Sequence, residues 1–298
     1  MTQNRHLTEP LPDLAWSPWV PLEGARSDPA VPKRPGLYRI RSVETGRILY
    51  IGQTGRSLRE RMGALKGVDG DEIPYNDPHT AGPALWAHRI EFGETFEVSV
   101  APLDVDKADR MGREALEVTK RRIIDGTSPA YNFGRMPRGW VKSSGNNRRL
   151  VEAGKRFRGY RLSDEEIAAL PPDPSATPPA TLEGDTRAAD WLGLAWRSAA
   201  VDAPGRGDVG VYRIATRPSG PLDYLGQGLI AQRWRRHADG WVTDLAAERA
   251  GETAWGWVPL EMGARQLLEV ENDLIASHMV MFARPPVAQF GRSGGGGG

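Results

Sequence analysis

The sequence predicts an α+β fold of two tandem small domains, each a short antiparallel β-sheet (a hairpin plus a further strand) flanked by helices. The first observation is an internal repeat: Tyr38 and Tyr50 recur as Tyr212 and Tyr224, 174 positions later, and each pair is twelve residues apart. The second is their context, because in both copies the first tyrosine ends a Gly-x-Tyr triplet and the second begins Tyr-x-Gly-Gln. The third is that the same order of elements follows each pair.

The elements of the first repeat follow from turn, cap and periodicity signals. Two β-prone runs, 36–40 and 47–51, flank the polar turn 44–46, which predicts an antiparallel hairpin. Ser57 is a good N-cap for a helix whose apolar residues recur at helical spacing. Residues 96–103 alternate as a third strand.

A long helix over 107–124 completes the first repeat, because Asp125-Gly126 and Pro129 end it. The second repeat predicts the same order: a hairpin over 210–226, a helix from about 230, a strand near 253–260 and a helix over about 264–281.

Each repeat begins with a lead-in that carries two tryptophans, Trp16 and Trp19 in the first copy and Trp191 and Trp196 in the second. We expect these indoles to pack against their sheets rather than to stack on bases.

The domain boundaries are predicted from a proline-rich segment, 170–181, which is unsuited to a helix or a central strand. The prediction is a first domain with a basic C-terminal extension at 1–162, a proline-rich linker at 163–188, a second and more divergent domain at 189–292, and a flexible glycine tail at 293–298.

Composition excludes several classes of function. The chain has 298 residues, no cysteine and a formal net charge of only +1, so disulfide frameworks, thiolate zinc sites and cysteine nucleophiles are excluded, and any polyanion-binding surface must be local. No apolar stretch approaches the roughly 18 residues of a spanning helix. We expect a cytoplasmic protein with no membrane partner.

The order of residues in both copies resembles the GIY-YIG nuclease superfamily, the fold of phage homing endonucleases, some restriction enzymes and the 3′-incision module of bacterial nucleotide-excision repair. The resemblance covers about 35–134 and, less completely, about 209–291. It rests on two hairpin tyrosines, an arginine on the next helix, a later helical glutamate and a closing asparagine. It implies that the tyrosines help to activate a water, the arginine neutralises the scissile phosphate and the glutamate binds one divalent metal ion.

Carried onto the first repeat, the resemblance implies a catalytic set of Tyr38, Tyr50, Arg61, Glu114 and Asn132. Arg61 is preferred because it follows the family's leucine, two residues, arginine pattern, although Arg56 and Arg59 are also placed to contact phosphate. Glu117 lies one turn from Glu114, but Glu114 matches Glu271 when both repeats are counted back from their Phe-Gly pairs.

The second repeat offers the corresponding candidates Tyr212, Tyr224, Arg233, His237, Glu271 and Gln289. Gln289 replaces the closing asparagine, and the segment before Arg233 is two residues shorter than the one before Arg61. The five histidines form no ligand set; only His237 shares a helix face with a proposed catalytic arginine. Two working sites and one working site joined to a degenerate copy both fit this pattern.

These residue types suit phosphodiester hydrolysis on chemical grounds. The reaction needs a positioned water and stabilisation of charge on the phosphate oxygens. A tyrosine whose pKa is lowered by a cation can take the water's proton, and an arginine fork matches phosphate geometry. A single carboxylate suits Mg²⁺ or Mn²⁺, and Glu114 and Glu271 are the candidate metal ligands.

A basic segment follows the first repeat. Between Arg135 and Arg161 there are nine Lys/Arg against one acid, with Trp140, Phe157 and Tyr160 interleaved, which is typical of a surface that contacts nucleic acid. The candidate nucleic-acid-binding residues are Arg56, Arg59, Arg135, Arg138, Lys142, Arg148, Arg149, Lys155, Arg156 and Arg158.

Together these observations predict a metal-dependent DNA endonuclease that hydrolyses phosphodiester bonds, with a role in restriction, defence or repair suggested by family analogy. RNA stays open as a substrate. The alternative is a catalytically degenerate nucleic-acid-binding protein that keeps the nuclease fold. The tandem repeats would take the place of a homodimer.

Overall fold

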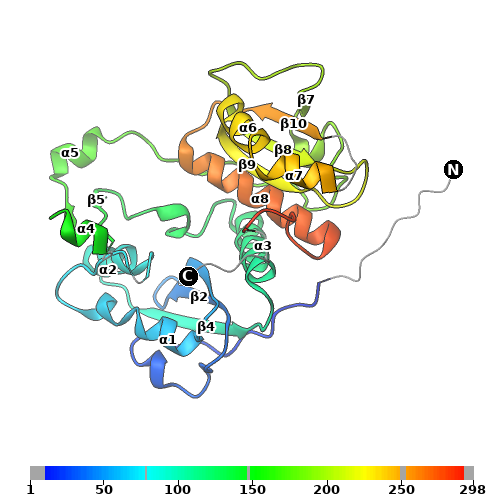
Figure 1. The fold of residues 1–298 in the computed structure, drawn as a ribbon. Helices are drawn as coiled ribbons and strands as arrows, with labels where there is room; N and C mark the ends of the chain where they lie inside the picture. The colour runs from blue at the N-terminus through cyan, green and yellow to red at the C-terminus, as the bar shows by residue number, and fades with distance from the viewer. Residues whose placement is uncertain (1–10, 78, 146–147, 249–252, 292–298) are drawn as a thin grey trace. The chain divides into compact units, whose positions relative to one another are not determined.

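The computed structural model describes residues 11–77, 79–145, 148–248 and 253–291 (Figure 1). The predicted glycine tail at 293–298 lies outside them. The chain divides into two compact units, each described here by itself. Among the described residues, the first unit comprises Leu14–Val105 and Pro129–Asp173, and the second comprises 11–13, Asp106–Ser128 and 174–291.

The first unit contains a four-stranded antiparallel sheet in the order β1-β4-β2-β3. Strands β2 and β3 form the predicted hairpin at one edge of this sheet, with Tyr38 opposite Gly52 and Ile40 opposite Tyr50. The strands are β1 (Val20–Pro21), β2 (Gly36–Ser42), β3 (Ile48–Thr54) and β4 (Phe96–Pro102).

The second unit contains a sheet of the same order, β7-β10-β8-β9, also antiparallel. Here Tyr212 lies opposite Gly226 and Ile214 opposite Tyr224, so the register of the first hairpin is repeated. The predicted α+β class, with a hairpin plus a further strand in each sheet, is confirmed. The strands are β7 (Arg197–Ser198), β8 (Val209–Ala215), β9 (Tyr224–Leu229) and β10 (Ala254–Pro259).

Helices of the first unit lie between and after its strands. The predicted cap of α1 is present, because the Ser57 side chain accepts a hydrogen bond from the Glu60 amide. The sequence did not predict α2, which follows α1. The helices are α1 (Leu58–Gly63), α2 (Gly82–Phe92), α4 (Arg148–Glu152) and α5 (Asp164–Ala169), with the small strands β5 (Trp140–Val141) and β6 (Tyr160–Arg161) and the 3-10 turns η1 (Ala25–Ser27), η2 (Lys66–Asp69) and η3 (Asn132–Gly134).

Two long helices dominate the second unit. Helices α3 and α8 have 19 residues each and pack along one another (Figure 1). At their contact the Gly112 position faces the side chain of Met279, which would have to shift to admit a Cβ atom there. The helices are α3 (Lys107–Asp125), α6 (Ile230–Ala238), α7 (Trp241–Glu248) and α8 (Ala264–Phe282), with the 3-10 turn η4 (Trp191–Gly193).

The compact units divide the chain differently from the predicted boundaries. Helix α3 belongs to the first repeat in sequence but packs with α8, and the chain joins the same unit from Pro174 onward. The segment 171–179 has no helix or strand, as its prolines require, yet Ala176 is fully buried within it. Part of the predicted linker is therefore packed against the second unit's core.

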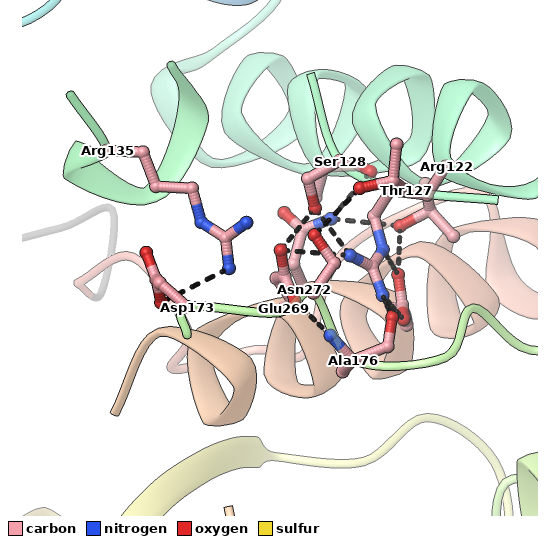
Figure 2. A network of polar contacts seen from close by, with 12 residues as sticks. Arg122, Thr127, Ser128, Arg135, Asp173, Ala176, Glu269 and Asn272 are labelled. Carbon is pink, nitrogen blue, oxygen red and sulfur yellow. Dashed lines mark hydrogen bonds and ion pairs between the residues drawn. The ribbon is translucent and has the colours of Figure 1, made fainter. Parts of the chain in front are cut away.

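A buried polar network joins α3, α8 and this packed segment (Figure 2). The guanidinium of Arg122, which is 0% exposed, donates two hydrogen bonds to the Asp273 carboxylate and one to the Ala176 carbonyl. It also lies 3.2 Å from Glu269, whose other oxygen accepts the Ala176 amide. Because every charge here has a partner, the network fixes how the two helices and the segment meet.

The tryptophan lead-ins pack within the protein. Trp191 and Trp196 are buried and stacked, with ring centroids 5.6 Å apart. Trp16 and Trp19 are half-buried, and both rings cover the guanidinium of Arg39. Among the described residues, no helix combines the length and the apolar character needed to cross a membrane.

Candidate functional site

Each hairpin presents its two tyrosines as a close pair. The rings of Tyr38 and Tyr50 are 6.0 Å apart, and those of Tyr212 and Tyr224 are also 6.0 Å apart. The pairs form because the strand register places the second tyrosine diagonally across from the first on one face of the sheet. Two phenol hydroxyls thus gather at one place in each repeat.

A glycine lies under each tyrosine pair. A Cβ atom at Gly52 would lie 2.5 Å from the Tyr38 hydroxyl and 2.6 Å from the Tyr50 ring, and a Cβ at Gly226 would meet Tyr212 and Tyr224 in the same way. Gly52 is the glycine of the Tyr-x-Gly-Gln pattern in the first copy. Its immediate neighbours are the phenol rings themselves.

We therefore expect Gly226→Ala to displace the second tyrosine pair, because the methyl group and the phenol oxygen cannot share this space. The cost in unfolding free energy should be about 1–3 kcal/mol, measured by urea denaturation. Gly207→Ala is the matched control, since a Cβ there would meet nothing within 4 Å. Equal stability of the two variants would contradict the packing described here.

A histidine contacts the first tyrosine of each pair. His79 Nε2 lies 2.8 Å from the Tyr38 hydroxyl, and His237 Nε2 lies 2.9 Å from the Tyr212 hydroxyl. Burial, aided by the charge of Arg61, lowers the pKa of His79 to about 3. Burial and the charges of Arg233 and Arg236 also lower the pKa of His237. Both imidazoles are therefore held neutral at physiological pH.

Sequence reasoning selected His237 but missed His79. His237 lies four residues after Arg233 on α6, so helical spacing identifies it. His79 lies in the turn before α2, and its neighbour Thr80 lies 3.4 Å from the Tyr50 hydroxyl. The only signal in the sequence was a histidine close to a Gly-Pro pair that begins a helix.

The arginine candidates of the first repeat separate in the structure. Arg61 is half-buried on α1, and its charge acts on His79. Arg59 donates to the backbone carbonyls of Val31 and Asp28, so it anchors the lead-in loop. Arg56 is exposed in the turn before α1.

Arg233 is the corresponding cation of the second repeat. It is exposed on α6, and its charge lowers the pKa values of Tyr212, Tyr224 and Glu271 against the effect of burial. A guanidinium that stabilises the charged forms of two phenols and a carboxylate is close to all of them. The second repeat therefore brings its cation, carboxylate and phenols together.

The closing amides make the same contacts in both repeats. The side chain of Asn132 accepts from the Ile51 amide at 3.0 Å and donates to its carbonyl at 2.8 Å. Gln289 forms the same two bonds with Leu225, both at 2.9 Å. Since these partners directly follow Tyr50 and Tyr224, each amide fixes the strand next to the second tyrosine. The extra methylene of Gln289 does not disturb this arrangement.

The glutamates are placed differently with respect to the two units. Glu271 lies on α8, where the Gln289 amide approaches its carboxylate at 3.5 Å, and burial raises its pKa to about 7. Glu114 is half-buried on α3 in the second unit, whereas Tyr38 and Tyr50 belong to the first unit. Glu117 pairs with a lysine one turn away on the same helix.

Burial and neighbouring charge hold both tyrosines of the second repeat in the protonated form. Burial raises the pKa of both Tyr212 and Tyr224, and the negative charge of Glu271 raises them further. A cation bound at Glu271 would reverse that second effect, because it would replace a net negative neighbour with a positive one. If either phenol is to act as a base, a cation besides Arg233 would help by lowering its pKa.

The donor set fits a hard divalent cation. Glu271 is a half-buried carboxylate without an ion-pair partner among the described residues, and it sits near the tyrosine pair. Within the same residues, no group of three or more His, Asp or Glu forms a metal-ligand cluster. Mg²⁺ is commonly bound by one or two carboxylates, with water and substrate phosphate as its other ligands. A single glutamate is sufficient for that mode of binding.

Part of the basic segment serves the fold. Arg135 is only 11% exposed and lies 3.9 Å from Asp173. Arg138 donates to the carbonyls of Ile167 and Leu170, at the end of α5. These two arginines are less available to phosphate than their charge suggests.

The rest of the segment presents charge and aromatic surface. The guanidinium groups of Arg156 and Arg158 lie 4.1 and 4.2 Å from the Tyr75 ring centre. Arg158 also pairs with Glu72 at 2.9 Å. Lys142 is half-buried, whereas the side chains of Arg148, Arg149 and Lys155 are exposed. This surface combines the exposed cations and aromatic ring that single-stranded nucleic acid can use.

Each unit thus contains the same three features: a phenol pair over a glycine, a neutral imidazole and an amide that fixes the strand. Comparisons of the chain with family models, with curated proteins and with solved structures found no match. The function is therefore inferred from the geometry of these two sites.

Proposed function

We propose that the protein is a metal-dependent DNA endonuclease with two GIY-YIG-like sites, one in each repeat. The observation that carries the proposal is the duplicated cluster of two phenols, an imidazole and a strand-fixing amide, with an arginine next to it. A duplicated edge-strand aromatic pair needs neither a neutral histidine nor a nearby arginine for packing. This combination suits proton transfer beside a phosphate.

Each group has a role in hydrolysis. A hairpin tyrosine takes the proton of the attacking water, and the neutral histidine orients the phenol pair through its hydrogen bond. Arg233, or Arg61 in the first repeat, stabilises the charge that develops on the phosphate oxygens. Asn132 and Gln289 hold the strand that carries the second tyrosine.

Glu271 and Glu114 would hold a divalent cation, Mg²⁺ or Mn²⁺. Such a cation supplies charge stabilisation to the phosphate and lowers the pKa of neighbouring acids. Glu271 would orient the cation, and the cation would compensate the negative charge of the Glu271 carboxylate. The pairing of α3 with α8 supports the further proposal that the tandem repeats replace a homodimer, because these are the helices that carry the two glutamates.

A second function, nucleic-acid binding without catalysis, is favoured by the raised pKa values of Tyr212 and Tyr224, which disfavour a base in the cation-free protein. In both functions DNA is the proposed partner, with RNA as the alternative polyanion. The exposed cations near Tyr75 support either.

Plasmid cleavage tests the proposal. Supercoiled DNA is incubated with wild type, Glu114→Ala, Glu271→Ala and the double variant, with Mg²⁺ and with EDTA. We expect metal-dependent cleavage by wild type, none with EDTA, and none by the double variant, because no carboxylate would remain to hold the cation.

The single variants assign the sites. Nicked circles from each of them would mean that each repeat cuts one strand, and loss of cleavage in Glu114→Ala alone would mean that the second copy is degenerate. Tight, salt-sensitive DNA binding without cleavage in any condition would reject the nuclease and support the binding function.

A further inference from the structure

The two histidines that contact the tyrosines occupy different places in the repeats. His237 lies on α6, the helix that follows the second hairpin, but α1, the corresponding helix of the first repeat, contains no histidine. Four residues after Arg61 the chain has Leu65, which is buried in the core. His79 reaches Tyr38 from the turn before α2 instead. The same contact is therefore built from two unrelated segments.

The other ring nitrogen of each histidine is also engaged. The backbone amide of Ala81 donates to His79 Nδ1 at 3.1 Å. The indole of Trp241 donates to His237 Nδ1 at 3.0 Å. A backbone N–H and an indole N–H are donors only, so each can bond only to a nitrogen that carries no hydrogen.

We propose that Trp241 and the Ala81 amide are positioning groups that fix one tautomer, with the hydrogen on Nε2, in His237 and His79 respectively. Each histidine then donates to the oxygen of Tyr212 or Tyr38, and cannot act as the acceptor of that tyrosine's proton. Two different donors impose the same direction on the same hydrogen bond.

The fixed direction distinguishes the two phenols of a pair. Tyr212 accepts from His237, so its own hydrogen is available to Tyr224, with which it is hydrogen-bonded. The hydrogen bond between the two phenols lowers the pKa of Tyr224, against the effect of burial. It raises the pKa of Tyr212, in the same direction as burial. Tyr224, and Tyr50 by the repeat, is therefore the phenol that more readily loses its own proton to solvent, and its phenolate is the base placed to receive the water's proton. This last step rests on the proposed nuclease function, whereas the tautomer does not.

Nuclear magnetic resonance of the full chain tests the tautomer directly. With ¹⁵N-labelled histidine, two-bond ¹H–¹⁵N correlations distinguish a protonated ring nitrogen from an unprotonated one. We expect His79 and His237 of the wild type to carry hydrogen on Nε2 only; His79→Gln and His237→Gln assign the signals. A hydrogen on Nδ1 of His237 in wild type would overturn the proposal.

Trp241→Phe tests the role of the indole, since it removes the donor and keeps an aromatic ring beside His237 and Tyr224. The titratable and charged groups that face His237 are Tyr212, Tyr224, Arg233 and Arg236, and none of them changes. Nδ1 then becomes free to take a proton. We expect the pKa of His237 to rise by about one unit, as the loss of one hydrogen bond to the neutral form implies, with both tautomers now populated.

His79 serves as the internal control, because its Nδ1 partner is unaltered. An unchanged His237 spectrum and titration in Trp241→Phe would refute the role of the indole, whether or not the protein cleaves DNA. If it does cleave, we expect Trp241→Phe to lower the kcat of the second site, assayed in Glu114→Ala, roughly 10-fold with little change in KM.

Discussion

Replacing Arg122 with methionine is expected to lower the free energy of unfolding by about 3–5 kcal/mol, because Asp273 and Glu269 would stay buried without their cation. Methionine fills a similar volume, so the loss reports mainly on charge. Burial already raises the pKa of Asp273 to about 6 in the presence of Arg122. Urea denaturation at pH 8 measures the effect.

Arg121→Met is the matched control. Arg121 is the preceding residue of α3 and pairs with Asp125 at the surface, where such a pair contributes about 0.3–0.5 kcal/mol. The cost of Arg122→Met should also shrink at pH 5, because the orphaned carboxyls can then take up protons. A similar loss in both variants, or a loss that does not depend on pH, would contradict the network as drawn in Figure 2.

The contact between α3 and α8 joins matching positions of the two repeats. Arg122 and Met279 are the sixteenth residues of α3 and α8, and Gly112 and Glu269 are the sixth. Arg122 contacts Glu269, and Met279 contacts Gly112. Each contact joins a sixteenth residue to a sixth residue, but one is an ion pair and the other is apolar. Pairing α3 with a second α3 would leave Arg122 facing a glycine. The contact thus favours pairing of the two repeats within one chain over pairing of identical copies.

Most strands and helices could be predicted because their signals are local. Gly-x-Tyr triplets, polar turns and the Ser57 cap act within a few residues, so the hairpins, α1, α3 and α8 were predicted near their observed bounds. Helix α2 was missed because Gly82–His88 is buried on every side and shows no amphipathic period. Helix α7 has only eight residues, and the sequence predicted no element between the helix from about 230 and the strand near 253–260.

The candidate site was predictable only where the repeat is strict. The tyrosines, the glycine beneath them and the closing amides recur at matching positions, so the sequence alone identified them. His79 has no counterpart at the matching position, and its contact with Tyr38 exists only because the turn before α2 folds over the sheet. Likewise, Arg59 differs from Arg61 because its guanidinium donates to two backbone carbonyls of the lead-in loop. Such long-range contacts leave no periodic trace in a sequence.

Replacing Glu271 with glutamine is expected to stabilise the metal-free protein at pH 8 by about 2–3 kcal/mol while abolishing cleavage at the second site. Burial raises the pKa of Glu271 from 4.5 to about 7, so the folded state holds this proton more tightly than the unfolded state does. The contribution of Glu271 to stability therefore falls as pH rises from about 4.5 to about 7. Glutamine keeps the shape and avoids the buried charge.

Urea denaturation in EDTA at pH 4 and pH 8 checks the sign. The gain from Glu271→Gln should vanish at pH 4, where the native carboxyl is already neutral, and the exposed control Glu261→Gln should change stability by less than about 0.5 kcal/mol at either pH. Equal stability of Glu271→Gln and wild type at pH 8 would mean that burial of the Glu271 carboxylate does not destabilise the protein. A gain accompanied by loss of cleavage would mean that the carboxylate of Glu271 costs stability in the metal-free protein, because Arg233 compensates its charge only in part, and that cleavage requires it.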